Sequence, residues 1–143
     1  MANIQGGADC AGDAGKRVGD LASAQFFRGG LSEVATVRGH RVVLDVGANT
    51  DCKPEYLVQF AIMGHAYGRV MFGLSEPKIG IISNGEEEDK GSILVRETYP
   101  LLKASGLNFV GNVEGKDIGK GLANVVVTDG LTGNVIVKLT EGV

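Results

Sequence analysis

From residue 41 onward, short apolar runs alternate with segments of helical periodicity, and this alternation constrains the fold more than any other feature. The apolar and β-branched runs lie at 41–46, 78–83, 107–110 and 124–128. Apolar residues recur at helical spacing over 54–72 and 92–105. Strands that alternate with helices are typical of a parallel sheet covered by helices. The sequence therefore predicts an α/β fold.

Prolines and β-branched residues refine the element boundaries. Pro54 suits the first turn of a helix, and that helix is apolar nearly all round, so it should pack on more than one side. Pro100 lies inside the next helical segment and should kink or shorten it. The β-branched run 134–139 favours a hairpin with 124–128 about as well as it favours a helix. The residues alone leave that choice open.

Residues 1–40 differ from the rest of the chain. The first 20 are rich in Gly, Ala and Asp and have almost no aliphatic periodicity, and the segment 34–37 is too short to assign. We therefore divide the chain into a loosely ordered N-terminal segment, 1–40, and a partial domain, 41–143.

Charge and composition exclude several classes of protein. The chain has 14 Lys and Arg against 17 Asp and Glu, a net charge of −3, which gives no electrostatic footprint for nucleic acid. No apolar run reaches the ~18 residues of a membrane helix, and no secretory signal is visible. Cys10 and Cys52 are too few for a disulfide framework, which predicts reduced thiols in a cytoplasmic protein.

Each of the four strand-like runs leads into a glycine beside an Asn or Asp. The junctions are Gly47-Ala48-Asn49, Asn84-Gly85, Gly111-Asn112 and Asp129-Gly130. Ligands of open parallel sheets bind beyond the carboxyl ends of the strands, and helix N-termini there favour anions. One such junction is better explained as an ordinary turn. Four at one edge predict a phosphate-sized anion site about as well as they predict turns.

Other motifs are weaker. The run 111–117 imitates a P-loop but is one residue short and lacks the Ser or Thr that would hold Mg²⁺. The acidic run 86–89 is better explained as a solvated loop than as a metal site, and Lys90 is either its salt partner or a phosphate ligand. His40 and His65 have no triad partner at a recognisable spacing, and Cys52 is more simply a packed thiol than a nucleophile.

Four blocks in order carry a resemblance to a known family. They are 44–55, 83–91, 108–118 and 126–135. Together they resemble the bacterial phosphate acyltransferases of phospholipid synthesis, the PlsX type, over about residues 42–142. The resemblance implies an incomplete three-layer αβα sandwich similar to isopropylmalate dehydrogenase and phosphate acetyltransferase. It also implies transfer of a fatty acyl group from acyl-acyl carrier protein to inorganic phosphate, giving acyl phosphate.

By motif position the resemblance implies that Lys90 and Asn134 are catalytic and that Gly133-Asn134 opens a helix. It assigns substrate binding to Asn49, Asn84, Gly85, Gly91, Asn112, Asp129, Gly130 and Gly133. Nothing in the sequence requires a metal ion or an organic cofactor.

The chain departs from the family at several places. The family's chains are longer, residues before 42 do not match its opening strand, and His65 stands where small residues are usual. The full-length family is expected to form homodimers and to touch membranes only through segments missing here. The alternative function is an inactive fragment that only binds phosphate or acyl carrier, or acts in assembly. A dehydrogenase of the related fold is disfavoured because the dinucleotide fingerprint and the metal-binding aspartates are missing.

Overall fold

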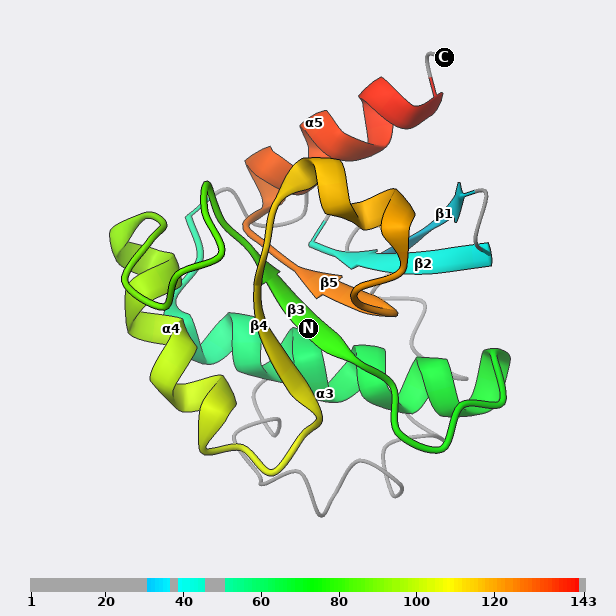
Figure 1. Ribbon diagram of the computed structural model, residues 1–143, viewed down its shortest axis with the longest axis horizontal. Coiled ribbons are helices and arrows are strands. Elements are labelled where there is room, and N and C mark those ends of the chain that lie inside the picture. The colour runs from blue at the N-terminus through cyan, green and yellow to red at the C-terminus, as the bar shows by residue number, and fades with distance from the viewer. Residues whose placement is uncertain (1–30, 37–38, 46–50, 142–143) are drawn as a thin grey trace.

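A computed structural model describes residues 31–36, 39–45 and 51–141 (Figure 1). Its strands are β1 (Leu31–Thr36), β2 (Gly39–Leu44), β3 (Ile79–Ile82), β4 (Phe109–Val113) and β5 (Val125–Val127). Its helices are α3 (Pro54–Met71), α4 (Ile93–Lys103), the 3₁₀ helix η4 (Gly115–Lys120) and α5 (Gly130–Glu141). Asn49 and residues 1–30, which include Cys10, lie outside the described residues.

The strands form one sheet in the order β1-β2-β5-β3-β4. Every neighbouring pair is parallel except β1 and β2, which are antiparallel. The chain order and the strand order differ because helices cross over between strands, as in other α/β proteins. The predicted α/β fold with a mostly parallel sheet flanked by helices is confirmed.

The two faces of the sheet carry cores of different size. The larger core joins alternate strand residues such as Val125 and Val127 to Leu57 and Phe60 of α3 and Leu102 of α4. The opposite face carries a smaller cluster formed by Val113, Ala123 and Val126. Side chains of a strand alternate between faces, so the three valines of β5 serve both cores.

Helix α3 begins at Pro54, so this proline occupies the first turn of the helix, as the sequence predicts. Every residue from Gln59 to Ala66 is buried, and the helix packs both on the sheet and against the neighbouring helix α4. The prediction that α3 packs on more than one side is confirmed. None of the helices in the described part of the chain combines the length and apolarity needed to cross a bilayer.

Strand β4 extends further than the sequence predicts. The expected strand ended at residue 110, with Gly111-Asn112 as its loop, but β4 continues to Val113. Its register against β3 shifts between Phe109 and Gly111, so the strand contains a bulge. Gly111 has φ +101°, which glycine adopts without the strain of other residues. The junction predicted at Gly111-Asn112 is therefore wrong, and the loop begins at Glu114.

Pro100 does not end α4, which continues to Lys103. A proline removes the backbone hydrogen bond to the residue four positions earlier, here Arg96. Both residues are exposed, so burial does not make the loss of this bond costly. The N-terminus of α4 is capped by Ser92, whose Oγ accepts a hydrogen bond from the Val95 backbone N–H at 3.3 Å.

The hairpin considered for the last segment does not form, because residues 130–141 are the helix α5. This helix begins three residues before the Gly133 expected from the family resemblance. Asp129 precedes it and accepts hydrogen bonds from the backbone N–H and the hydroxyl of Thr132, both at 2.8 Å. Such an N-terminal cap favours a helical start over a strand.

Strand β1, which the sequence left unassigned, pairs with β2 along its whole length. Glu33 of β1 accepts a hydrogen bond from the hydroxyl of Tyr67 on α3 at 2.7 Å and lies 3.3 Å from Nδ1 of His40. Part of the segment 1–40 is thus joined to the sheet and to α3. The domain division at residue 40 stays a prediction.

Candidate functional site

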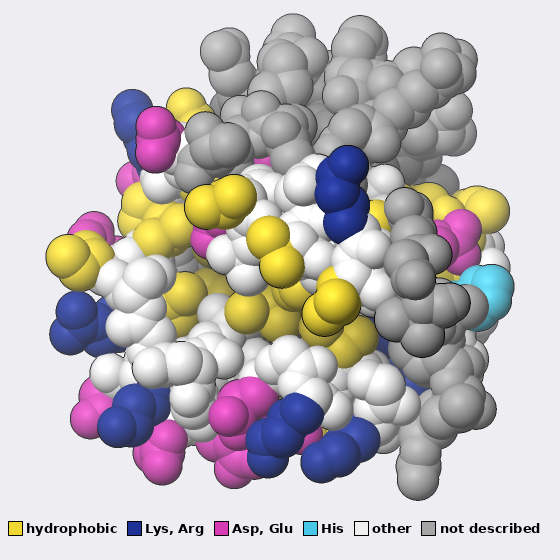
Figure 2. Space-filling model, turned by 90° about the horizontal axis from the view of Figure 1, so that it is seen from above, with side chains coloured by type: hydrophobic (Ala, Val, Ile, Leu, Met, Phe, Trp, Pro, Cys, Tyr) yellow, Lys and Arg dark blue, Asp and Glu magenta, His cyan; other side chains and the backbone are white. Residues whose placement is uncertain are grey.

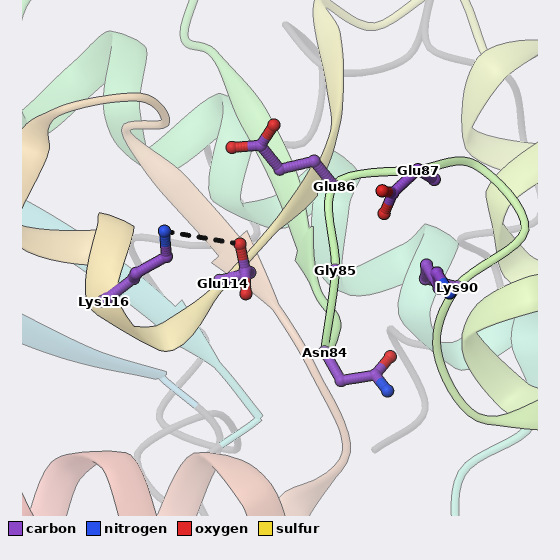
Figure 3. A pocket seen from close by; sticks show the side chains of 7 residues that line it. All are labelled: Asn84, Gly85, Glu86, Glu87, Lys90, Glu114 and Lys116. Atoms are coloured by element: carbon purple, nitrogen blue, oxygen red, sulfur yellow. Dashed lines mark ion pairs between the residues drawn. The ribbon is translucent and has the colours of Figure 1, made fainter.

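A hollow of about 500 Å³ lies at the carboxyl ends of β3 and β4 (Figure 3). Its lining residues are Asn84, Gly85, Glu86, Glu87, Lys90, Glu114 and Lys116. Three of these, Asn84, Gly85 and Lys90, are site residues predicted from the sequence. The two loops that follow β3 and β4 therefore meet as expected for the carboxyl edge of a parallel sheet.

Backbone and side-chain hydrogen bonds hold the loop that carries Lys90. The Ser83 backbone N–H donates to the Val113 carbonyl at 3.0 Å, which joins the ends of β3 and β4. The Glu87 carbonyl accepts from the Lys90 backbone N–H at 3.0 Å and from Nδ2 of Asn112 at 2.6 Å. The backbone of Lys90 is thus anchored while its side chain is exposed to solvent.

Asn112 is buried within β4 and binds the loop rather than lining the hollow with Lys90. Gly91 is half-buried, and a Cβ there would crowd Val95 and the hydroxyl of Ser83. These contacts explain both residues as supports of the β3–α4 loop. Contact with substrate is therefore not needed to explain why Asn112 and Gly91 occupy these positions, and that contact stays a prediction.

Of the charged residues that line the hollow, the sequence predicted only Lys90 as a site residue. Glu86, Glu87 and Glu114 contribute carboxylates, and Lys90 and Lys116 contribute ammonium groups, which gives one net negative charge. Nζ of Lys116 lies 3.7 Å from Oε2 of Glu114, a loose and partly exposed pair. Glu114 and Lys116 were overlooked because the sequence placed the junction after β4 too early in the chain.

The start of α5 lies beyond β5, the parallel neighbour of β3, and so at the same edge of the sheet. Asp129 is half-buried and caps the helix, while Gly130 is buried. Asn134 is half-buried in the second turn of α5 and has a bonding partner. None of these residues lines the hollow that contains Lys90. The edge of the sheet therefore presents two groups of predicted residues.

Gly133 has a packing role that the sequence did not reveal. A side chain at this position would collide with the carbonyl oxygen of Asp45, directly after β2. Only glycine allows α5 to approach the backbone so closely. The requirement for glycine here is explained without a ligand, and its predicted contact with substrate stays a prediction.

Cys52 lies beside the start of α5 and remains a protonated thiol at neutral pH. Burial raises its pKa to about 11, with smaller contributions from Asp45, Asp129 and Asp51, and the backbone of Gly130 opposes this rise. A nucleophilic cysteine needs a lowered pKa. The structure supports the packed-thiol interpretation of Cys52.

The two histidines also lie outside the hollow. His65 is buried in α3, and burial followed by the nearby charge of Arg69 lowers its pKa. His40 lies near Glu33 and packs edge-on against Phe72, with ring centroids 6.4 Å apart. The structural interpretation of both histidines agrees with these positions.

Comparison with known proteins gives the family of the chain. The profile of the family described as "Fatty acid synthesis protein" matches residues 31–143, which is most of the sequence. The chain belongs to this family. The match includes β1, which the resemblance found in the sequence did not reach.

Curated relatives of the family share high identity with the chain. It is 49% identical to the phosphate acyltransferase of Aquifex aeolicus (strain VF5) over 146 residues, 96% of this chain and 43% of the relative. It is 57% identical to that of Elusimicrobium minutum (strain Pei191) over 107 residues, 75% of this chain and 31% of the relative. It is 60% identical to that of Helicobacter acinonychis (strain Sheeba) over 102 residues, 71% of this chain and 30% of the relative. The chain thus spans less than half the length of these relatives.

Proposed function

We propose that this chain forms part of the site at which an acyl group passes from acyl-acyl carrier protein to inorganic phosphate. The hollow that contains Lys90, Asn84 and Gly85, in a chain that resembles phosphate acyltransferases, is the observation that carries this proposal. Phosphate and the acyl carrier are the substrates, and acyl phosphate and the free carrier thiol are the products.

The chemistry needs no covalent intermediate on the protein. A phosphate oxygen attacks the thioester carbonyl, a C–O bond forms, and the C–S bond breaks. The sulfur leaves as thiolate and takes a proton to become the free thiol. Phosphate is a competent nucleophile near neutral pH, so the absence of a histidine among the hollow's lining residues is consistent with this reaction.

The chemistry of each residue indicates its role in the proposed reaction. Lys90 acts as a point charge for phosphate, supported by backbone N–H groups near Gly85. The start of α5 offers further N–H groups near Gly130. Asn134 donates a hydrogen bond to the developing oxyanion or to the phosphate. Proximity of the two substrates supplies much of the remaining rate enhancement.

Thiol release from acyl-acyl carrier protein, measured with and without phosphate, tests this function. We expect release only with phosphate, and Lys90→Ala should reduce it by at least about tenfold, because the charge that holds phosphate is lost. Lys103→Ala is the matched control: Lys103 is also exposed and lies at the end of α4 outside the hollow, where its Nζ makes only a loose, exposed pair with Glu88 at 3.8 Å.

Two results would contradict the proposal: release that does not depend on phosphate, or equal rates for Lys90→Ala and Lys103→Ala. Calorimetric titration of phosphate distinguishes the alternative function. Phosphate binding that Lys90→Ala weakens, without any thiol release, supports a fragment that binds substrate but does not turn it over.

A further inference from the structure

Asn112 is buried in β4 and bonded to the loop that carries Lys90, and we propose that it is a positioning residue for the Lys90 ammonium group. Its Nδ2 donates a hydrogen bond to the Glu87 carbonyl at 2.6 Å, across 25 positions of the chain. The same carbonyl accepts the Lys90 backbone N–H at 3.0 Å. This role rests on the proposed function, in which Lys90 binds phosphate.

The register of β4 explains why the side chain of Asn112 reaches this loop. Asn112 lies opposite Ile81 of β3, and Ile81 belongs to the core formed with α3 and α4. Residues opposite each other on paired strands point to the same face of a sheet. The amide of Asn112 therefore lies on the α4 side of the sheet, where it meets the loop. Asn112 is not among the residues that line the hollow with Lys90.

Two glycines give the loop a conformational freedom that such an anchor restricts. Gly85 and Gly91 lie near its two ends, and Gly91 has φ +104°. Glycine leaves a segment with more backbone freedom than any other residue. The bond from Lys90 to Glu87 closes a turn within the loop, whereas the bond from Asn112 joins that turn to a strand. Asn112 thereby limits where the backbone of Lys90 can move.

The side chain of Lys90 is directed by a second contact. A Cβ on Gly85 would lie 2.9 Å from Cγ of Lys90 and 3.4 Å from its Cβ. The aliphatic stem of Lys90 therefore packs on the backbone of Gly85, and its direction follows from the relative position of these two parts of the loop. Because the backbone and the stem are already ordered, the ammonium group loses less conformational entropy when it binds an anion.

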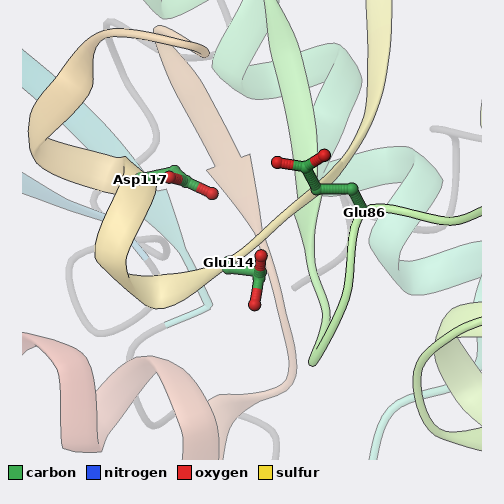
Figure 4. A group of neighbouring side chains, drawn as sticks. All are labelled: Glu86, Glu114 and Asp117. Atoms are coloured by element: carbon green, nitrogen blue, oxygen red, sulfur yellow. The ribbon is translucent and has the colours of Figure 1, made fainter.

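The nearby carboxylates do not neutralise the charge of Lys90. Glu86, in the same loop, points toward Glu114 and Asp117, and one oxygen of each residue lies within 4.8 Å of the others (Figure 4). Figure 3 shows the Glu86 side chain directed away from Lys90. None of the ion pairs among the described residues involves Lys90. An ammonium group that is held in place without an acidic partner suits the capture of phosphate.

A double-mutant cycle of phosphate binding, measured by calorimetry on the whole chain, tests this role. We expect Asn112→Ala to weaken phosphate affinity by about threefold to tenfold, because the ammonium group is displaced rather than removed. The double variant Asn112→Ala and Lys90→Ala should bind no more weakly than Lys90→Ala alone, since Asn112 acts only through Lys90. A general loss of stability, or a direct contact of Asn112 with phosphate, would weaken binding in both backgrounds.

Asn108→Ala is the matched control. Asn108 directly precedes β4, and its Nδ2 donates to the Glu76 carbonyl at 3.1 Å, at the opposite end of the sheet. Its loss should leave phosphate affinity unchanged. Asn112→Val is a second variant in case Asn112→Ala does not fold, which circular dichroism reports. Valine suits a buried strand position and has no side-chain donor for the Glu87 carbonyl.

Weakened phosphate binding in a folded Asn112 variant that disappears in the Lys90→Ala background supports the positioning role. Equal affinity of the Asn112 and Asn108 variants, while Lys90→Ala weakens binding, overturns this role alone. Additive losses in the double variant also overturn it, because Asn112 then acts without Lys90. Unchanged affinity in Lys90→Ala would contradict the phosphate site itself and the positioning role with it, so the two failures are distinguishable.

Discussion

Single residues at the carboxyl edge of the sheet differ in how freely they reach a ligand. Lys90 is exposed on an anchored loop, whereas Asn134 is half-buried in α5 and already has a bonding partner. A charge that must capture phosphate benefits from exposure, and a donor that must be placed accurately benefits from a rigid helix. These positions agree with the different roles that we propose for the two side chains.

Asn134→Ala should lower the rate of phosphate-dependent thiol release by about 10²–10³, the usual effect of removing one donor to a developing oxyanion. Phosphate affinity should change less than the rate if the amide acts mainly on the oxyanion. Val135→Ala, an exposed neighbour on α5, is the control. A rate equal to that of the control would show that Asn134 has no role in the reaction.

His65 should make the folded state less stable in mild acid. Burial and the charge of Arg69 hold its pKa below the ordinary value of 6.5. As pH falls through 6.5, the unfolded chain takes up a proton that the folded chain does not, so the free energy of unfolding decreases. Above that pH the contribution is constant.

Urea unfolding between pH 5 and 8 measures this effect. The contribution of His65 to the slope of the free energy of unfolding against pH is at most about 1.4 kcal/mol per pH unit, the limit for one proton. His65→Gln should remove it, because glutamine does not titrate. An unchanged slope in the variant would show that other groups cause the acid sensitivity.

Among the secondary-structure elements, α5 depends most on one close contact. Its first turn is capped by Asp129, and Gly133 lets it approach the carbonyl of Asp45 after β2. A helix rich in β-branched residues is weak by itself. Packing against the sheet therefore stabilises it, and the beginning of α5 depends on the end of β2.

Gly133→Ala should decrease the free energy of unfolding by about 1–3 kcal/mol, because the added methyl group forces the helix away from the sheet. Chemical denaturation of the two proteins measures the difference. Gly119→Ala in η4 is the control, since nothing lies within 4 Å of an added Cβ there. Equal stability of the two variants would contradict the close contact.

At the scale of the whole molecule, helix α5 exposes an apolar stripe. Leu131, Val135 and Leu139 recur every four residues on α5 and are 63%, 56% and 70% exposed. Figure 2 shows hydrophobic side chains across the face seen from above, the side on which α5 lies in Figure 1. An apolar stripe of this kind promotes association.

The double variant Leu131→Lys and Leu139→Lys should reduce concentration-dependent self-association, which sedimentation velocity measures. Charged side chains on the stripe oppose its contact with another apolar surface. Leu101→Lys, an exposed leucine on α4, is the single-site control. The prediction fails if the unsubstituted chain is monomeric throughout the micromolar range.

The sequence alone was sufficient for the parallel arrangement of β2, β3, β4 and β5 and for the start of α3 at Pro54. Both follow from local patterns, because apolar periodicity and proline geometry act within a few residues. The same patterns placed the loop that carries Asn84, Gly85 and Lys90 at the carboxyl edge of the sheet, because the loops that follow parallel strands lie at that edge. The family resemblance added that the last segment is a helix.

Only the tertiary structure decided the extent of β4, the role of Gly133 and the composition of the hollow. A bulge at Gly111 carries β4 past its expected end, and Asp45 excludes a side chain at position 133. Glu86 meets Glu114 and Asp117 although 28 and 31 positions separate them from it in the chain. Such contacts depend on how separate elements pack, and no local pattern of residues encodes the distance between them.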